Sequence, residues 1–511
     1  MLRKVVRNTY ILSLGTLSSR ILGFIRDVLI ANFFGTSAIL EAFLVAFRLP
    51  NIFRSLFAEG FSDSVATPVL SEYHKNKEKI FNIGSHLVSL SAIVLLAVTS
   101  LGIIFAKQFV ILIAPGFIAE SAKFNLAVSF SRITFIYLFL IGLSSIITSI
   151  LYSLKKFLIP AITPVFLNIS FIVGILLFSR FFKNYILTIC VVAAGILQLI
   201  FPFIALKKQG FACRFSLSEA LADRQIWRML KLFIPRIWSS LVYHLSIYVD
   251  TIFSSLAFIV GQGALAAVYY ANRLIQFPFA LIALSISRVA IVDLSSYHNQ
   301  GNMEEFKKLF VFSFQNIIFF IIPISLIFTF IPRDIIEVVF VRGEFGAHSL
   351  DMTSLVFFFY SLGLFFFCGI KLLVNSFYSL KDTKLPAKTA TLALLVNIVL
   401  SATLMFFVGI SGVALGSSLA AMFNFFLLYH FLKKRIGYID WQDTRKEFLK
   451  VFILGVVVAF VCRFILDTVL IGRYLTMLAA LACALLTFVL GGYLLKIKHI
   501  QHFKKWVLRK S

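Results

Sequence analysis

The chain has 511 residues, of which 60% are hydrophobic and 14% are charged, whereas soluble proteins are ~45–50% apolar and ~25% charged. This composition excludes a string of ordinary soluble domains and indicates an all-α polytopic membrane protein. The formal net charge of +26 would suggest a nucleic-acid partner in a soluble protein. In a membrane protein, the first question is how the basic residues divide between loops and membrane spans. We expect no nucleic-acid partner here.

Apolar stretches long enough to cross a bilayer, which takes roughly 20 residues, follow one another along the whole chain. We predict fourteen transmembrane helices, at 8–32, 38–63, 82–106, 125–153, 157–179, 185–206, 230–258, 262–293, 309–332, 352–378, 385–408, 411–432, 449–470 and 474–495. The first two carry so many charges that hydropathy alone scores them poorly. The basic N-terminal segment lacks a cleavage site of the A-x-A type, so we expect the first helix to be retained.

The loops give an independent test of this topology, because cytoplasmic loops carry an excess of Lys and Arg. With the N-terminus in the cytoplasm, 31 of the 48 basic residues lie in cytoplasmic segments and seven lie on the other side. This asymmetry predicts a multi-pass protein with both termini in the cytoplasm. Ten basic residues remain inside the proposed spans.

Two halves of the chain resemble each other. Residues 152–161 read YSLKKFLIPA and residues 378–387 read YSLKDTKLPA, an offset of 226. Ala46 to Leu49 precede Ala271 to Leu274 by 225 residues, which makes Arg48 and Arg273 equivalent. Because the offset spans six helices, the halves share one orientation and form parallel repeats.

This repeat predicts four segments and two lobes around a central cavity, the form expected of an alternating-access transporter. They are an N-terminal six-helix lobe at 1–207, a cytoplasmic linker at 208–231, a C-terminal six-helix lobe at 232–433, and a terminal transmembrane helix pair with a basic tail at 434–511. Within the linker, Ser216 and Glu219 form a capping-box pattern at the start of an amphipathic stretch. An interfacial helix and a plain cytoplasmic linker explain that stretch equally well.

Basic residues inside a bilayer cost at least ~2.5–3.5 kcal/mol each and usually face a wet cavity. Some of the ten, such as Arg236, Arg288 and Arg463, could extend to an interface. The remaining arginines concentrate in the first two spans and at the repeat-equivalent position, and they are our candidate substrate-binding residues: Arg20, Arg26, Arg48, Arg54 and Arg273. Guanidinium groups suit phosphate oxygens, so a cavity lined by them and by Phe, Leu and Ile predicts an amphiphile with an anionic head.

Acidic residues accompany these arginines, and Asp27, Glu41 and Glu59 are the expected supporting carboxylates. The alternative is internal ion pairing, for instance of Arg26 with Asp27 or of Arg54 with Glu59. We expect Pro50 to break the second helix near the cavity.

A cation site is a further expectation, with Asp250 and Asn375 as its candidates; a structural hydrogen bond for Asp250 is the competing interpretation. The chain has no GxxxxGK[ST], GxSxG or HExxH motif, and its five cysteines are scattered. We therefore expect no enzyme activity, no bound metal and no cofactor, apart from Na⁺ as a candidate coupling ion.

Several of these segments are similar to one known family. The stretch from Ser19 to Tyr73 closely resembles the N-terminal signature of the MurJ/MviN lipid II flippases. The resemblance continues through 114–117, 160–168, 270–278 and 377–386. It implies the multidrug/oligosaccharidyl-lipid/polysaccharide exporter fold in the bacterial cytoplasmic (inner) membrane.

The resemblance also implies a function. The family moves undecaprenyl-pyrophosphoryl-disaccharide-pentapeptide, lipid II, from the inner to the outer leaflet for peptidoglycan synthesis and cell shape. The resemblance implies that Arg20, Arg26, Arg54 and Arg273 contact the diphosphate. It also implies that Arg48 occupies a basic position of the family and that Glu59 occupies the family's acidic position. Glu41 and Asn272 depart from the pattern, since Asp is frequent at both places. Partners are then lipid II and membrane lipids, and no oligomer is required.

Three alternatives to a lipid II flippase remain. The first is a flippase for another polyprenyl-diphosphate-linked sugar, such as an O-antigen or capsule unit. The second is a cation-coupled drug antiporter of the same fold, which would favour acidic cavity residues. The third, a membrane-bound transferase, lacks an acidic metal or base cluster in the loops.

Overall fold

The computed structural model describes residues 2–469 and 471–501, and the side chains of 2–13, 58–59, 63, 183 and 235–244 are outside that description. Every regular element of the described chain is a helix, which confirms the all-α class. Eleven helices are long and apolar enough to cross a membrane. They are α4 (Lys77–Ile104), α6 (Ser121–Ser153), α8 (Val165–Phe182), α9 (Ile186–Lys207), the continuous stretch Ala264–Asn299, α15 (Met303–Phe330), α17 (Ala347–Ser379), α18 (Lys384–Val408), α19 (Ile410–Ile436), α20 (Gln442–Thr468) and α21 (Arg473–Leu494).

The other three predicted spans are helical as well, although their charges lower their hydropathy. They correspond to α1 (Leu2–Phe34), to α2 (Ala38–Ser55) with its continuation, and to α11 (Arg224–Ser254). The helix order is therefore consistent with fourteen spans. The shorter helices are α3 (Thr67–Ser71), α5 (Ala106–Ile113), η2 (Pro115–Ala119), α7 (Leu158–Ile162), η3 (Lys183–Tyr185), α10 (Leu217–Ala222), α12 (Ala257–Val260) and α16 (Pro332–Phe340).

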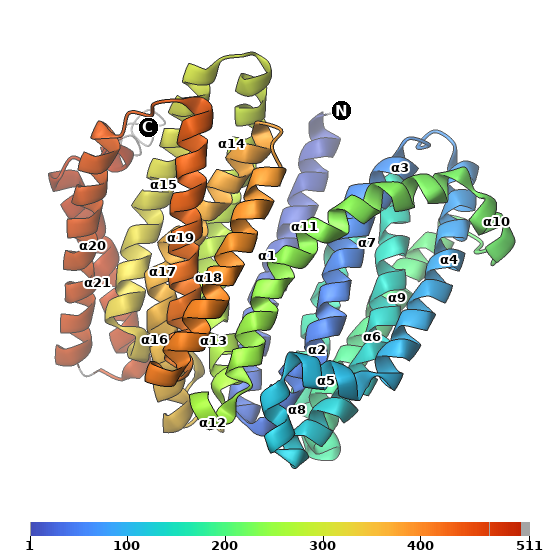
Figure 1. Cartoon of the computed structure of the whole chain (residues 1–511), viewed down its shortest axis with the longest axis horizontal. Helices are drawn as coiled ribbons and strands as arrows, with labels where there is room; N and C mark the ends of the chain where they lie inside the picture. Colours follow the sequence, from blue (N-terminus) through green and yellow to red (C-terminus); the bar gives the residue numbers. More distant parts are fainter. Residues whose placement is uncertain (1, 470, 502–511) are drawn as a thin grey trace. The chain divides into compact units, whose positions relative to one another are not determined.

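The chain divides into two compact units, residues 1–256 and 257–511. In the first unit α6 lies at the centre and packs against α2, α4 and α9, while in the second α17 packs against α15, α19 and α13 (Ala264–Pro278). The terminal pair α20 and α21 packs together, with α20 against α15 (Figure 1). Because α11 packs on α4 and α5, it belongs to the first unit by contact. The boundaries of the four predicted segments rest on the sequence offset and stay a prediction.

A π-helix interrupts one helix in each unit. In the first unit η1 (Leu56–Ala66) follows α2, and in the second η4 (Phe279–Ala283) joins α13 to α14 (Leu284–Asn299). Both follow the arginine segments that the repeat aligns, and π-turns are frequent at functional sites. The expectation that Pro50 breaks the second helix is wrong, since α2 continues through it to Ser55. The helix changes at Leu56, one and a half turns later, because neighbouring helices hold the segment in place around the proline.

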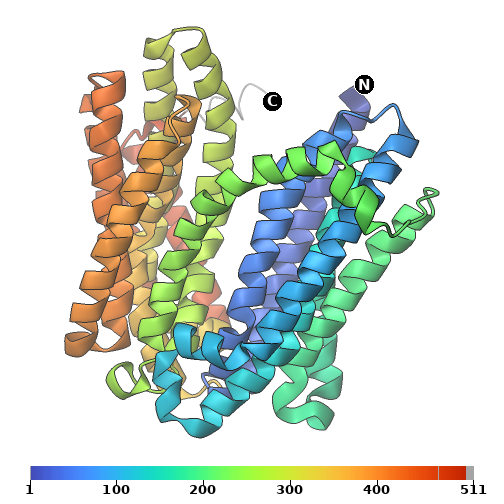
Figure 2. The same ribbon diagram turned by 45° about the vertical axis from the view of Figure 1, so that its right-hand side comes forward.

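The linker predicted for 208–231 forms α10 and the first turns of α11, which lie across the ends of α3 and α4 (Figures 1 and 2). The Ser216 hydroxyl accepts a hydrogen bond from the Glu219 N–H, so the predicted cap forms. Ile226 and Met229 enter the hydrophobic core of the first unit. The stretch thus forms two helices, and apolar residues of the second pack into the protein; an interfacial helix and a plain linker both stay open as interpretations.

Polar contacts attach this linker to the rest of the first unit. His86 of α4 lies between two carboxylates, with Nδ1 2.8 Å from Asp223 Oδ2 and Nε2 3.3 Å from Glu219 Oε2. Arg228 donates to both carboxylate oxygens of Glu72, at 2.7 and 2.8 Å. This hydrogen-bonded guanidinium lowers the pKa of the Glu72 carboxyl.

Candidate functional site

Arg26 of α1 is the best-defined member of the predicted arginine set. Its Nε and Nη2 donate to Asp27 Oδ1 at 3.0 and 2.8 Å, and its Nη1 donates to Asn168 Oδ1 of α8 at 3.1 Å. The guanidinium also lies 5.6 Å from the ring centroid of Phe171. The ion pair with Asp27, which the sequence left open as the alternative to a substrate-binding role for Arg26, is present. Because a guanidinium has five N–H donors, these three bonds leave two for a ligand.

Asn168 is a site residue that sequence reasoning missed. It is 4% exposed, and its Nδ2 donates to the Ser19 carbonyl at 2.8 Å while its Oδ1 accepts from Arg26. The one feature of the sequence that could have indicated Asn168 is that it is a single amide side chain within an apolar span. A Cβ added at Gly23 would lie 3.7 Å from Asn168 Oδ1, so a glycine or alanine at position 23 permits this approach and a larger side chain would displace the amide.

Arg54 lies in the same region of the first unit. Its Nε donates to Asn51 Oδ1 at 3.0 Å, one turn earlier in α2. Arg26 and Arg54 both lie within electrostatic reach of the buried Tyr137 hydroxyl, which donates to Gln198 Oε1 at 3.2 Å. Two cations therefore share one polar region in an apolar helix bundle.

The other two arginines of the first unit differ in their surroundings. Arg20 is exposed on α1, and no carboxylate contacts it in the described part of the chain. Arg48 is half-buried on α2 and lies within electrostatic reach of Tyr248. The Glu59 side chain lies outside the described residues, and so does its expected pairing with Arg54.

Glu41 has a different partner from the one expected of a supporting carboxylate. It forms a buried ion pair with Lys123, and the two residues are 2% and 3% exposed. Lys123 Nζ also lies 3.8 Å from Glu120 and 4.4 Å from the ring centroid of Phe117. Lys123 was expected in a loop between spans, but it lies in the first turn of α6, because that helix begins four residues before the predicted span.

The fifth predicted arginine belongs to the second unit. Arg273 is exposed on α13, with Nη2 3.4 Å from the Tyr269 hydroxyl and its guanidinium carbon 4.9 Å from that ring centroid. The neighbouring Asn272 accepts from Gln276 at 2.9 Å. An aromatic ring one turn earlier thus supports this arginine.

The two candidates for a cation site lie in different units. Asn375 of α17 is buried and donates to the Ser287 carbonyl at 3.0 Å. Asp250 of α11 is half-buried, and its backbone carbonyl accepts from Ser254. Across the described side chains, no group of three or more His, Cys, Asp and Glu could hold a metal ion.

Arg463 is not an isolated charge on the terminal helix pair. It donates to Asp334 Oδ2 at 3.1 Å, and it pairs with Asp467 at 2.7 Å. Burial raises the pKa of the Asp334 carboxyl, and the positive charge of Arg463 opposes that rise. This ion-pair group connects α20 to α16 inside the second unit.

Comparisons with known proteins agree on one family. The family model described as lipid II flippase MurJ matches residues 30–482. A probable lipid II flippase MurJ of Buchnera aphidicola subsp. Acyrthosiphon pisum is 35% identical over 89% of this chain and 88% of its own length. The lipid II flippase MurJ of Burkholderia cenocepacia is 32% identical over 82% of each chain.

Solved structures show the same relationship. A lipid II flippase MurJ in an inward closed conformation is similar with a TM-score of 0.80 and 27% identity, over 94% of this chain and 98% of that one. An inward-facing multidrug resistance transporter of the MATE family has a TM-score of 0.65 at 13% identity, over 82% of this chain and 94% of its own. The second match shows a shared fold only.

Proposed function

Because this chain belongs to the MurJ family of lipid II flippases, we propose that it moves lipid II from the inner to the outer leaflet of the bacterial cytoplasmic membrane. The translocation would proceed by alternating access and supply peptidoglycan synthesis. Family membership over residues 30–482 is the observation that carries this proposal. The multi-pass helical architecture supports it.

The arginines are the proposed contacts for the diphosphate of the substrate. Arg26 supports this role best, because Asp27 and Asn168 orient its guanidinium and leave two donors unused. A pre-oriented guanidinium loses little conformational freedom when it binds a phosphate. Arg54 shares its region, and Arg20, Arg48 and Arg273 complete the proposed set.

The site chemistry supports transport without catalysis. The residues named here are suited to holding an anion, and no nucleophile with an adjacent base is among them. We assign no cofactor, and Na⁺ coupling through Asp250 or Asn375 stays a proposal. We propose that both termini lie in the cytoplasm, because Lys and Arg are concentrated in the loops on the same side as the termini.

Complementation tests the substrate. The unmodified chain, expressed in a strain depleted of its own lipid II flippase, is expected to restore growth. Failure at normal membrane levels would favour another polyprenyl-diphosphate-linked sugar. The triple variant Arg20→Ala/Arg26→Ala/Arg273→Ala is expected to abolish growth, and normal growth with it would contradict the arginine assignment.

A further inference from the structure

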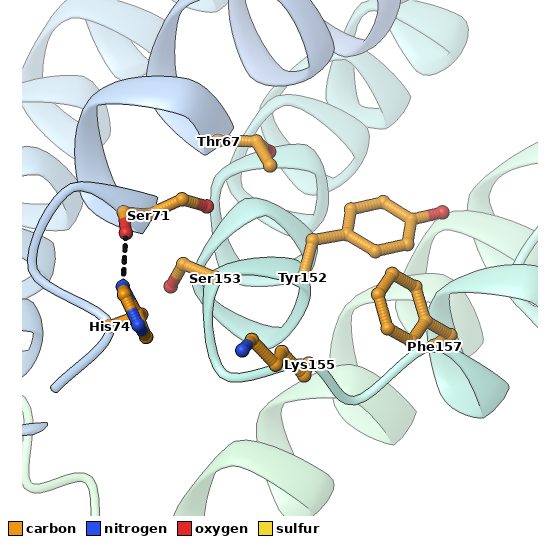
Figure 3. A pocket seen from close by; sticks show the side chains of 7 residues that line it. All are labelled: Thr67, Ser71, His74, Tyr152, Ser153, Lys155 and Phe157. Carbon is orange, nitrogen blue, oxygen red and sulfur yellow. Dashed lines mark hydrogen bonds between the residues drawn. The ribbon is translucent and has the colours of Figure 1, made fainter. Parts of the chain in front are cut away.

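A cavity of about 480 Å³ lies in the first unit where α3 and α6 end, and none of the five candidate arginines lines it (Figure 3). Thr67, Ser71 and His74 line it from α3 and the turn that follows. Lys155 and the rings of Tyr152 and Phe157 line it from the end of α6. The lining contains one lysine, one histidine, hydroxyl groups and aromatic rings, and it contains no carboxylate.

Two hydroxyl groups of this lining are available to a ligand. Thr67 and Ser71 are four residues apart on α3, so they share one face of the helix. Thr67 Oγ1 is buried with no hydrogen-bond partner in the described chain, an arrangement that costs free energy unless something binds there. Ser71 Oγ likewise makes no hydrogen bond within the described chain.

His74 adds a third polar group. Its Nδ1 lies 3.2 Å from the Ser71 carbonyl oxygen. Because a carbonyl only accepts, Nδ1 carries the proton, and Nε2 is the nitrogen left for a ligand. In the imidazolium form Nε2 is a donor as well.

Lys155 occupies an unusual backbone position. Its φ is +59°, and the N–H groups of Lys155 and Lys156 donate to Tyr152 and Leu151 as in a Schellman motif. Glycine is the usual residue there, because the left-handed conformation costs other residues ~1–2 kcal/mol. A lysine at this position therefore has a backbone cost that other interactions must offset.

Two other helices of the described chain end in the same way, with a left-handed lysine. These two lysines serve as controls for Lys155. Tyr378 to Lys381 and Tyr493 to Lys496 repeat the pattern Tyr-x-Leu-Lys, with φ of +61° and +53° at the lysines. A positive charge at a helix C-terminus is favourable by itself, and that explanation applies to all three. The three turns share the left-handed backbone and the favourable dipole, and of their three lysines Lys155 is the one that lines the cavity described here.

We propose that this cavity binds a phosphoryl group, held by Lys155, Thr67, Ser71 and His74, with an apolar part of the ligand against Tyr152 and Phe157. Figure 3 shows the polar side chains of Ser71, His74 and Lys155 gathered on one side and the two rings side by side on the other. The ring centroids of Tyr152 and Phe157 are 5.8 Å apart. The candidate membrane helix α6 ends at Ser153, so we expect the cavity to lie near the depth of the lipid headgroups.

The test uses the purified full chain in neutral detergent and measures thermal unfolding. Dioctanoyl phosphatidylglycerol is the lipid probe, dioctanoylglycerol is its phosphate-free counterpart, and inorganic phosphate is the soluble probe. We expect saturable stabilisation by the phosphatidylglycerol and none by dioctanoylglycerol. Saturable stabilisation by inorganic phosphate that depends on Lys155 would instead assign the site to a soluble phosphate.

The variants are chosen so that the fold survives. Lys155→Gly relieves the left-handed backbone and Thr67→Val keeps the shape of the side chain, so both should unfold at or above the wild-type temperature without ligand. Each is expected to raise the apparent Kd about tenfold or more, the size of a lost charged or buried hydrogen bond. Lys381→Gly makes the same backbone change elsewhere and should leave the Kd unchanged. Equal Kd values for Lys155→Gly and the wild type with both phosphate probes, or equal weakening by Lys381→Gly, would overturn the proposal.

Discussion

The side chain of Asn168 in α8 accepts a 3.1 Å hydrogen bond from Arg26 Nη1 in α1. The same amide donates to the Ser19 carbonyl of α1. Since an amide has one acceptor oxygen and one donor nitrogen, Asn168 connects the arginine to the backbone of its own helix. We therefore expect Asn168 to position Arg26 rather than to contact the substrate itself.

Asn168→Ala is expected to reduce transport strongly while the protein still reaches the membrane. It removes one of the partners that orient Arg26, and the loss of a hydrogen bond to a charged group costs ~1.5–3 kcal/mol. The measurement is complementation of the flippase-depleted strain, with membrane levels checked in parallel. Asn316→Ala, which removes a half-buried amide that donates to Phe312 of its own helix, is the control and should support normal growth. Equal growth of the two variants would contradict the positioning role.

Lys123→Met is expected to destabilise the protein by ~3–5 kcal/mol, because it leaves the Glu41 carboxylate buried without its main counter-charge. Glu41→Gln should have a similar effect. The double variant should be more stable than the sum of the single effects predicts, and thermal unfolding in detergent measures all three. Additive losses would show that the two groups do not depend on each other.

The Glu72–Arg228 pair predicts a pH dependence in the linker. The folded-state pKa of Glu72 is lowered, so its contribution is present above the ordinary Glu value of ~4.3 and is lost as pH falls through the lowered pKa. At neutral pH, Glu72→Gln is expected to increase hydrogen exchange in residues 224–231, and this difference from the wild type should shrink in acid. Glu305→Gln, which breaks an exposed pair within α15, should leave exchange in 224–231 unchanged. If the difference in hydrogen exchange between Glu72→Gln and the wild type persisted below the pKa of Glu72, the Glu72–Arg228 pair would not be its cause.

His86→Phe is expected to release α10 from α4. The two ring nitrogens face Asp223 and Glu219, and the substitution leaves both carboxylates without this partner. Hydrogen exchange of residues 217–222 should rise several-fold, while α6 remains protected. His430→Phe, at an exposed position in the second unit, should change nothing in α10. Unchanged exchange in His86→Phe would show that apolar packing alone holds the linker.

The sequence by itself determined the properties that depend on near neighbours. Runs of apolar residues predicted the helices, since a bilayer span depends on local composition, and adjacency made the ion pair of Arg26 with Asp27 one of the two interpretations that the sequence left open. The capping residue Ser216 was predictable for the same reason, because a cap involves residues three apart.

Only the tertiary structure decided the partners that lie far apart in the chain. Asn168 is 142 residues from Arg26, and Asp223 is 137 residues from His86. The sequence places Lys123 in a loop between two spans. In the structure α6 begins before Lys123, which is buried against Glu41. Hydropathy and charge are sums over a segment, whereas these contacts depend on which faces of two helices pack together, and a single sequence does not specify that geometry.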